Sequence, residues 1–160
     1  SADRIRQAAN FGFRIYFGDG TRKDVLRAAG IERAKIVAVC TQKQEVTDRV
    51  VDMVLAEFPQ ARLFVRAYDR VHLLSLQARG IDYGERETFE GGLKFGARTL
   101  EELGVDEATV MDLVEDTRER DFARLALQAA EGITAGRDML HTRPVGPEPL
   151  IKPRKREEQD

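Results

Sequence analysis

RIYFGDGTRKDVLRAAGIERAKIVAVC, residues 14–40, is the stretch that decides the fold class. It opens with a short β-type run, which a Gly-Asp-Gly turn ends, and a helical segment over residues 22–29 follows. Thr21 stands at the N-cap position of this segment, and Gly30 is expected to end it in a left-handed conformation. Residues 35–40 are apolar at nearly every position, as a parallel strand covered on both faces requires. The stretch predicts strand, turn, helix and a central parallel strand.

The alternation of helix and strand continues along the chain. Residues 41–58 read as a helix that Pro59 stops, and residues 62–66 read as a strand. Residues 70–79 then form a helix with Val71, Leu74 and Ala78 on one side. Helices alternating with strands at short intervals predict βαβ units, a parallel sheet and right-handed crossovers.

The character of the sequence changes after Gly84. Residues 85–103 hold no strand signal and predict one long helix, although three glycines interrupt it. A second helical stretch covers residues 107–130. Prolines and mixed charges dominate residues 137–160, which we interpret as a tail without a basis for packing.

Composition limits the classes of function. The 160 residues suit one domain, and a hydrophobic content of 42% with 34% charged residues is typical of a soluble, helix-rich chain. A formal charge of -2 argues against a nucleic-acid partner, and no apolar run is long enough to span a membrane. Cys40 is the single cysteine, so it forms no internal disulfide or thiolate metal site, and its apolar neighbours predict a buried core residue.

Two motifs carry a resemblance to a known family. YFGDGTR, residues 16–22, resembles the strand-turn-helix signature of RCK domains, also called KTN domains, which regulate potassium conductance and transport. ERETFEGGLK, residues 85–94, resembles the cytosolic domain of Kef-type glutathione-regulated potassium-efflux antiporters. The resemblance extends over roughly residues 11–105 and is loose beyond them.

The resemblance implies a TrkA-N-like Rossmann fold that binds a nucleotide, AMP or NAD(H), and glutathione at a homodimer interface. It implies that the rest of the same polypeptide is a membrane transporter, which places the domain at the cytoplasmic face of the inner membrane. The glycine fingerprint G-x-G-x-x-G is absent from the sequence. We therefore expect an α/β fold with an N-terminally truncated, Rossmann-like parallel sheet, lacking its first strands and glycine-rich loop, followed by C-terminal helices.

The chain is expected to have three parts. Residues 1–105 are expected to form a partial RCK/KTN domain, with a dimerisation helix over residues 85–105. Residues 106–136 are expected to form a helical extension, and residues 137–160 a flexible tail.

The candidate nucleotide-binding residues follow two of the predicted strands, at the sheet edge where α/β folds bind ligands. They are Asp19, Thr21, Thr41 and Gln42. Three of them have structural alternatives: Asp19 suits an ordinary turn, and Thr21 and Thr41 suit helix caps. Capping is the simpler interpretation of Thr21.

The candidate residues for a glutathione-like ligand are Arg66, Tyr68, Asp69 and His72. The family pattern is Arg-Ala-Arg-Asp, whereas this chain has Tyr68 in place of the second arginine. A tyrosine offers one neutral hydroxyl where an arginine offers a charged, bidentate fork, which puts glutathione recognition in question. The simpler alternative for His72 is an exposed helix residue.

Residues after the sheet are candidates for a dimer interface, since the resemblance implies that this helix packs against a partner and its glycines allow close approach. They are Glu87, Phe89, Glu90, Gly92, Leu93 and Gly96. The alternative is a solvated helix start whose acids the helix dipole favours.

The sequence shows no catalytic constellation and no metal-ligand cluster. It therefore predicts a non-enzymatic, ligand-sensing domain that gates a Kef-type potassium:proton antiporter. One alternative is a nucleotide-dependent oxidoreductase on the same fold, for which His72 is the one candidate acid or base. Another is a dimerisation scaffold whose nucleotide site has been lost.

Overall fold

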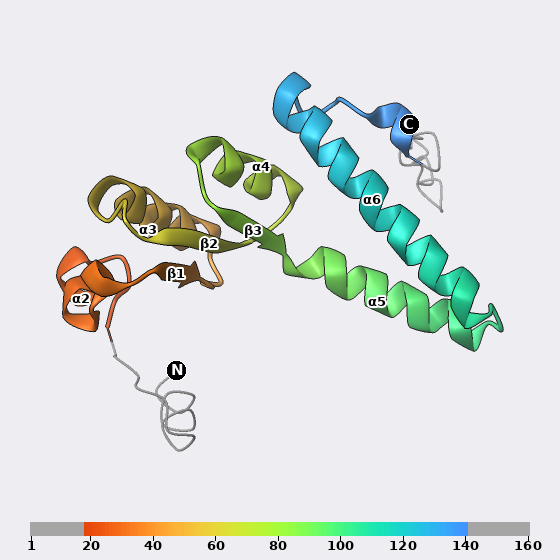
Figure 1. The fold of residues 1–160 in the computed structure, drawn as a ribbon, viewed down its shortest axis with the longest axis horizontal. Coiled ribbons are helices and arrows are strands. Elements are labelled where there is room, and N and C mark those ends of the chain that lie inside the picture. The colour runs from red at the N-terminus through yellow and green to blue at the C-terminus, as the bar shows by residue number, and fades with distance from the viewer. Residues whose placement is uncertain (1–17, 141–160) are drawn as a thin grey trace, which may run out of the picture.

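The computed structural model describes residues 18–140. The β-type run expected at residues 14–17 and the part of the predicted tail beyond residue 140 lie outside the described residues. The described elements form a small sheet with helices packed on it, and two long helices that extend to one side (Figure 1).

The sheet is parallel, as the sequence predicts. Its strands are β1 (Ile36–Val39), β2 (Arg62–Ala67) and β3 (Tyr83–Arg86), in the order β1-β2-β3. Val37 lies beside Leu63 in the register, and Phe64 lies beside Tyr83. Within the described residues β1 is an edge strand, so the expectation of a central strand covered on both faces is not met there.

Helices cover one face of this sheet. After α2 (Lys23–Ala29) and a single 3-10 turn (Ile31–Arg33), the chain forms α3 (Gln44–Glu57) and α4 (Arg70–Arg79). Val51, Val54 and Leu76 from these helices are buried against Leu63 and Val65 of β2. Removal of this apolar surface from water stabilises the fold by roughly 1.5–3 kcal/mol for each fully buried side chain.

The other face of the sheet remains open within the described residues. Ile36 is 50% exposed and Tyr83 is 49% exposed, although both are large and apolar. Cys40 is also exposed, which corrects the prediction that it is a buried core residue. The apolar run of β1 is therefore buried only at Val39, which belongs to the core cluster together with residues of α3 and α4.

The strand β3 is an element that the sequence did not predict. Residues 85–103 were expected to be one helix, but Glu85 and Arg86 pair with β2, and α5 (Glu87–Glu102) begins directly after them. No loop separates β3 from α5. The strand has the composition Tyr-Gly-Glu-Arg, which lacks β-branched residues, so pairing with β2 rather than local propensity accounts for it.

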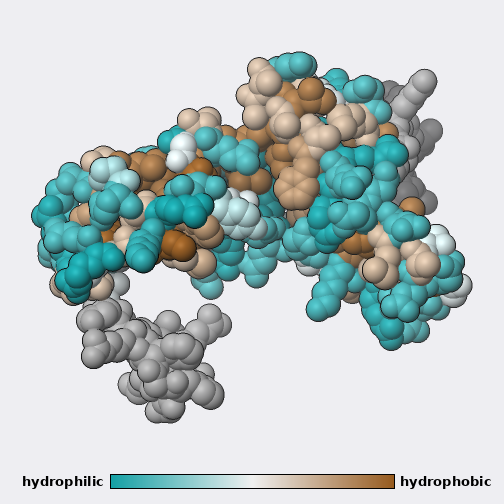
Figure 2. Space-filling model, viewed as in Figure 1, coloured by the Kyte–Doolittle hydropathy of each residue, from teal (hydrophilic) through white to brown (hydrophobic). Residues whose placement is uncertain are grey.

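The long helices form a hairpin. α5 packs against α6 (Glu107–Glu131), and the C-terminal half of α6 lies beside α4 (Figure 1). Apolar residues gather on the viewed face along this half of α6, where Phe122 is 63% exposed (Figure 2). Part of the predicted tail is ordered: Arg137–Met139 form a 3-10 turn, and Leu140 lines a hollow together with Arg124 of α6. Among the described residues, no helix is both long and apolar enough to cross a membrane.

Candidate functional site

The carboxyl ends of all three strands meet at one pocket of about 370 Å³. Since parallel strands end at the same edge of a sheet, the loops that follow them converge there, which is where open α/β sheets bind ligands. The volume lies within the range of about 300–1,000 Å³ that is usual for small-molecule sites. The pocket is lined by Thr41, Gln42, Gln44, Thr47, Arg66, Ala67, Tyr68, His72, Glu87 and Thr88.

The loop after β1 supplies one wall of this pocket. Thr41 Oγ1 lies 2.6 Å from Oγ1 of the buried Thr47, so the two hydroxyls share a hydrogen bond. Thr41 is therefore not the cap of α3, which begins after Lys43 without a side-chain cap. The amide of Gln42 is exposed beside it, where a ligand can reach it.

Arg66 connects the ends of the three strands. Its Nη1 donates to Glu87 Oε2 at 2.9 Å, and its Nη2 donates to the Thr41 carbonyl oxygen at 3.2 Å. Thr41 follows β1, Arg66 belongs to β2, and Glu87 follows β3. The positive charge that would attract an anionic ligand is thus present in the pocket, but a carboxylate of the same chain already contacts it.

The loop after β2 places Tyr68, Asp69 and His72 in different roles. The Asp69 carboxylate accepts the backbone N–H of His72 at 2.8 Å, which makes Asp69 the N-cap of α4. His72 is only 1% exposed, so the interpretation of it as an exposed helix residue is wrong. Tyr68 is 65% exposed at the mouth of the pocket.

Burial of His72 also corrects the predicted face of α4. This helix buries His72, Leu73 and Leu76, whereas Val71 is 62% exposed. A histidine can be buried when its ring nitrogens have hydrogen-bond partners. The buried face of a helix can therefore differ from the face that its apolar residues predict.

Asp19 and Thr21 do not line this pocket. They form an exposed turn before α2, in which the Asp19 carboxylate accepts the backbone N–H of Thr21 at 2.9 Å and its hydroxyl at 2.7 Å. These hydrogen bonds hold the pKa of Asp19 below its ordinary value. Thr21 is not a helix cap, because α2 has Arg22 at that position.

The candidates on α5 divide into two groups. Phe89 and Glu90 face α6 of the same chain: Phe89 lines a hollow together with Asp121 of α6, and Arg118 donates to both Glu90 oxygens at 3.2 and 3.0 Å. The Arg86 guanidinium, at the end of β3, lies 4.4 Å from the centre of the Phe89 ring. The pKa of Glu90 is lowered, chiefly by the hydrogen bonds from Arg118. In contrast, Gly92 is exposed and has open space around it.

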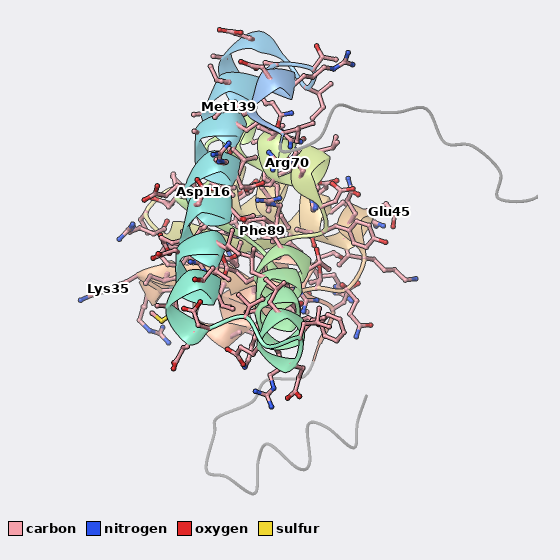
Figure 3. The ribbon with its side chains drawn as sticks, turned by 90° about the vertical axis from the view of Figure 1, so that its right-hand side faces the viewer. Lys35, Glu45, Arg70, Phe89, Asp116 and Met139 are labelled. Carbon is pink, nitrogen blue, oxygen red and sulfur yellow. The ribbon has the colours of Figure 1, made fainter. Side chains whose placement is uncertain are left out.

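Sequence reasoning missed a polar cluster between α4, β3 and α6. Asp121 of α6 accepts hydrogen bonds from Arg70 and Arg86, and Arg70 also donates to Gln128 at 2.9 Å. Arg70 lies between α4 and α6 in the side-chain view (Figure 3). Burial, with the nearby charges of Arg124 and Arg86, lowers the pKa of Arg70 to about 10. No sequence signal distinguishes Asp121 within the charged run of α6.

Comparison with known proteins adds to this geometry. The family model described as TrkA-N domain matches residues 1–84. A curated "Glutathione-regulated potassium-efflux system protein" from Haemophilus influenzae is 35% identical over 151 residues, which are 94% of this chain and 24% of that protein. The KefC protein of the same system from Cronobacter sakazakii is 37% identical over 103 residues, 64% of this chain and 17% of that protein. The chain thus spans a quarter or less of these relatives.

A solved structure is similar as well. It is described as Shewanella denitrificans Kef CTD in AMP bound form. The TM-score is 0.69 at 27% sequence identity, and the match covers 73% of this chain and 74% of that one. The predicted resemblance and the Rossmann-like fold are confirmed by these findings.

Proposed function

The chain belongs to the TrkA-N domain family, and from this premise we propose that it is the nucleotide-binding regulatory domain of a Kef-type potassium-efflux protein. The observation that carries the proposal is the convergence of three strand ends on one polar pocket. The AMP-bound state of the similar Shewanella structure supports a nucleotide as the ligand.

The residues of the pocket fit such a ligand. The Thr41 hydroxyl and the amides of Gln42 and Gln44 offer hydrogen bonds suited to a ribose or a base edge. The Arg66 guanidinium offers a positive charge suited to a phosphate. Because two donors of Arg66 already contact Glu87 and Thr41, a nucleotide phosphate must share or replace these contacts.

Regulation in this proposal is a shift between two packings of the domain. The ligand must bind one packing better than the other, and a coupling of about 1–3 kcal/mol is enough for useful gating of the attached transporter. The domain would act at the cytoplasmic face of the inner membrane. Glutathione is a second proposed ligand, for which the Arg66 charge is the supporting feature.

A second copy of the chain is the proposed partner. On α5, Phe95 is 77% exposed and Leu103, at its C-terminal end, is 76% exposed. Gly92 and Gly96 leave open space near this surface. Large apolar side chains next to small residues are typical of a helix that packs on another helix at close range.

The structure offers no support for the oxidoreductase alternative. Both ring nitrogens of His72 have hydrogen-bond partners in the protein, Tyr68 and Asp48, so the ring is not available as an acid or base. No other histidine lies among residues 18–140. We therefore propose a regulatory rather than an enzymatic role.

Titration of AMP and NADH into the whole protein, followed by calorimetry, tests the proposal. Gln42→Ala should weaken binding of the preferred nucleotide by about threefold to tenfold, because it removes one ligand-facing amide. Gln77→Ala, at an exposed position on α4, is the matched control and should bind like the unmodified protein. If neither AMP nor NADH binds, the proposed function is refuted.

A further inference from the structure

His72 lines the pocket, and both nitrogens of its imidazole ring have hydrogen-bond partners within the protein. The backbone N–H of Tyr68 donates to Nδ1 at 3.0 Å, and Nε2 lies 3.2 Å from Asp48 Oδ1. Because Nδ1 accepts a hydrogen bond, it carries no proton, and the proton of the neutral ring is on Nε2. The surroundings thus select one tautomer, with an acceptor toward Tyr68 and a donor toward Asp48.

This single ring connects three parts of the site. Tyr68 is the first residue after β2, Asp48 belongs to α3, and His72 itself lies in the first turn of α4. Asp48 is held in turn by Arg79 Nη1 at 2.9 Å, from the last turn of α4. The backbone N–H of His72 is bonded to Asp69. The position of the loop after β2 is therefore fixed from both of the helices that pack beneath it.

Because the Tyr68 N–H donates to His72, it is not available to a ligand. A backbone donor at this edge of the sheet would otherwise be free to contact a ligand, as such amides are in many α/β sites. Here the amide points to a buried ring, while the Tyr68 side chain remains 65% exposed and lines the pocket. What this loop offers to a ligand is the tyrosine side chain.

We propose that His72 is a positioning residue: through Nδ1 it holds the Tyr68 amide, and so presents the Tyr68 side chain at the mouth of the nucleotide pocket. The inference rests on the proposed function for its ligand. It differs from the expectation that His72 itself contacts the ligand, because the ring is 1% exposed and has no free nitrogen.

Two substitutions separate the two hydrogen bonds of the ring. In His72→Asn the amide oxygen can take the place of Nδ1 and accept from Tyr68, but the side chain is too short to reach Asp48. In His72→Gln the amide nitrogen can take the place of Nε2 and donate to Asp48, but nothing replaces Nδ1. Both variants lose the ring, so each serves as the stability control for the other.

Calorimetric titration of AMP into the whole protein gives the first measurement. His72→Asn should keep the affinity within about threefold of the unmodified protein, and His72→Gln should lower it about tenfold, the effect of losing one hydrogen bond at the loop. Equal losses in the two variants would overturn the inference, since a merely structural ring cannot distinguish them.

Hydrogen exchange of the Tyr68 amide gives a second measurement that needs no ligand. The amide should be protected in the unmodified protein and in His72→Asn, and should exchange at least about tenfold faster in His72→Gln. If AMP does not bind but this difference is found, the proposed function fails while the positioning of the loop stands. An unprotected Tyr68 amide in the unmodified protein would contradict the inference directly.

Discussion

Asp121 of α6 accepts a hydrogen bond from Arg86, the last residue of β3, and the side chains of both residues are 10% exposed. Arg70, at the start of α4, donates to the other oxygen of the same carboxylate. One acid thus neutralises part of the charge of two guanidinium groups whose side chains are only 16% and 10% exposed. It fixes the helical hairpin to the elements that carry the pocket.

Asp121→Ala should therefore destabilise the fold strongly. The substitution leaves two arginines in a poorly solvated site without their acceptor, and the loss of one partner of a buried pair costs about 3–5 kcal/mol. Urea unfolding followed by circular dichroism measures the change. Asp112→Ala, at an exposed position of the same helix, should alter stability by less than about 0.5 kcal/mol. A similar small effect of Asp121→Ala would show that the cluster does not hold the hairpin.

Gly84→Ala should destabilise the sheet. A Cβ at this position of β3 would clash with Leu73 Cδ1 and would lie 3.0 Å from Ile81 Cδ1, so both side chains would have to move. Overpacking of this kind costs about 1–3 kcal/mol. Gly91→Ala in α5 is the control: apart from its chain neighbours and the backbone of its own helix, no atom lies within 4 Å of its added Cβ. Removal of a helical glycine should stabilise by up to about 1 kcal/mol. Thermal unfolding should therefore show a lower melting temperature for Gly84→Ala and a higher one for Gly91→Ala than for the unmodified protein.

Glu90 should contribute stability that is lost in acid. Its pKa in the folded chain is lowered from 4.5, first of all by the hydrogen bonds from Arg118. A lowered pKa means that the ionised form stabilises the fold above pH 4.5, and that this contribution disappears as the pH falls below 4.5 through the folded-state value. Stability measured between about pH 6 and about pH 3 should therefore fall less steeply for Glu90→Gln.

Variants of Arg118 test whether the pH dependence of stability comes from the pair of Glu90 and Arg118. Arg118→Gln should reduce the acid-dependent loss to a similar extent, and the double variant should add nothing further. A double variant that shows the sum of both effects would mean that Glu90 and Arg118 act separately.

Glu87→Ala should strengthen binding of glutathione, if this peptide is a ligand. Removal of Glu87 frees the Arg66 Nη1 donor for a ligand carboxylate, and an exposed pair of this kind is worth about 0.2–1 kcal/mol, or up to about fivefold in affinity. Glu45→Ala removes the same charge from the exposed first turn of α3 and should leave the affinity unchanged. Calorimetry with the whole protein gives the comparison. Absence of binding even to Glu87→Ala would exclude glutathione from this pocket.

Much of the fold could be predicted because its signals are local. The bounds of α4, Arg70–Arg79, agree with the sequence expectation, and Gly30 and Gly80 end their helices with φ of 95° and 93°. The strand β3 could not be predicted in this way, since a polar run becomes a strand only when a neighbour such as β2 offers its backbone.

The residues that line the pocket could be predicted where they follow strands, whereas contacts between segments far apart in the sequence could not. Thr41, Gln42, Arg66 and Tyr68 reach one pocket because each lies at a strand end. The burial of His72 depends on Asp48, 24 residues earlier, and the cluster at Arg70 depends on Asp121, 51 residues later. Periodicity within a short window contains no information about such pairs.

Because β3 joins α5 directly, a rotation of the strand end would also rotate the helix. Arg86 is the last residue of the strand and Glu87 the first of the helix, so any rotation at the sheet edge passes into the helix without a loop to absorb it. The helix has 16 residues, or about 24 Å at about 1.5 Å per residue. A tilt of about 5° at the pocket would therefore displace the far end by about 2 Å, a distance comparable to the shifts that change helix packing at subunit interfaces.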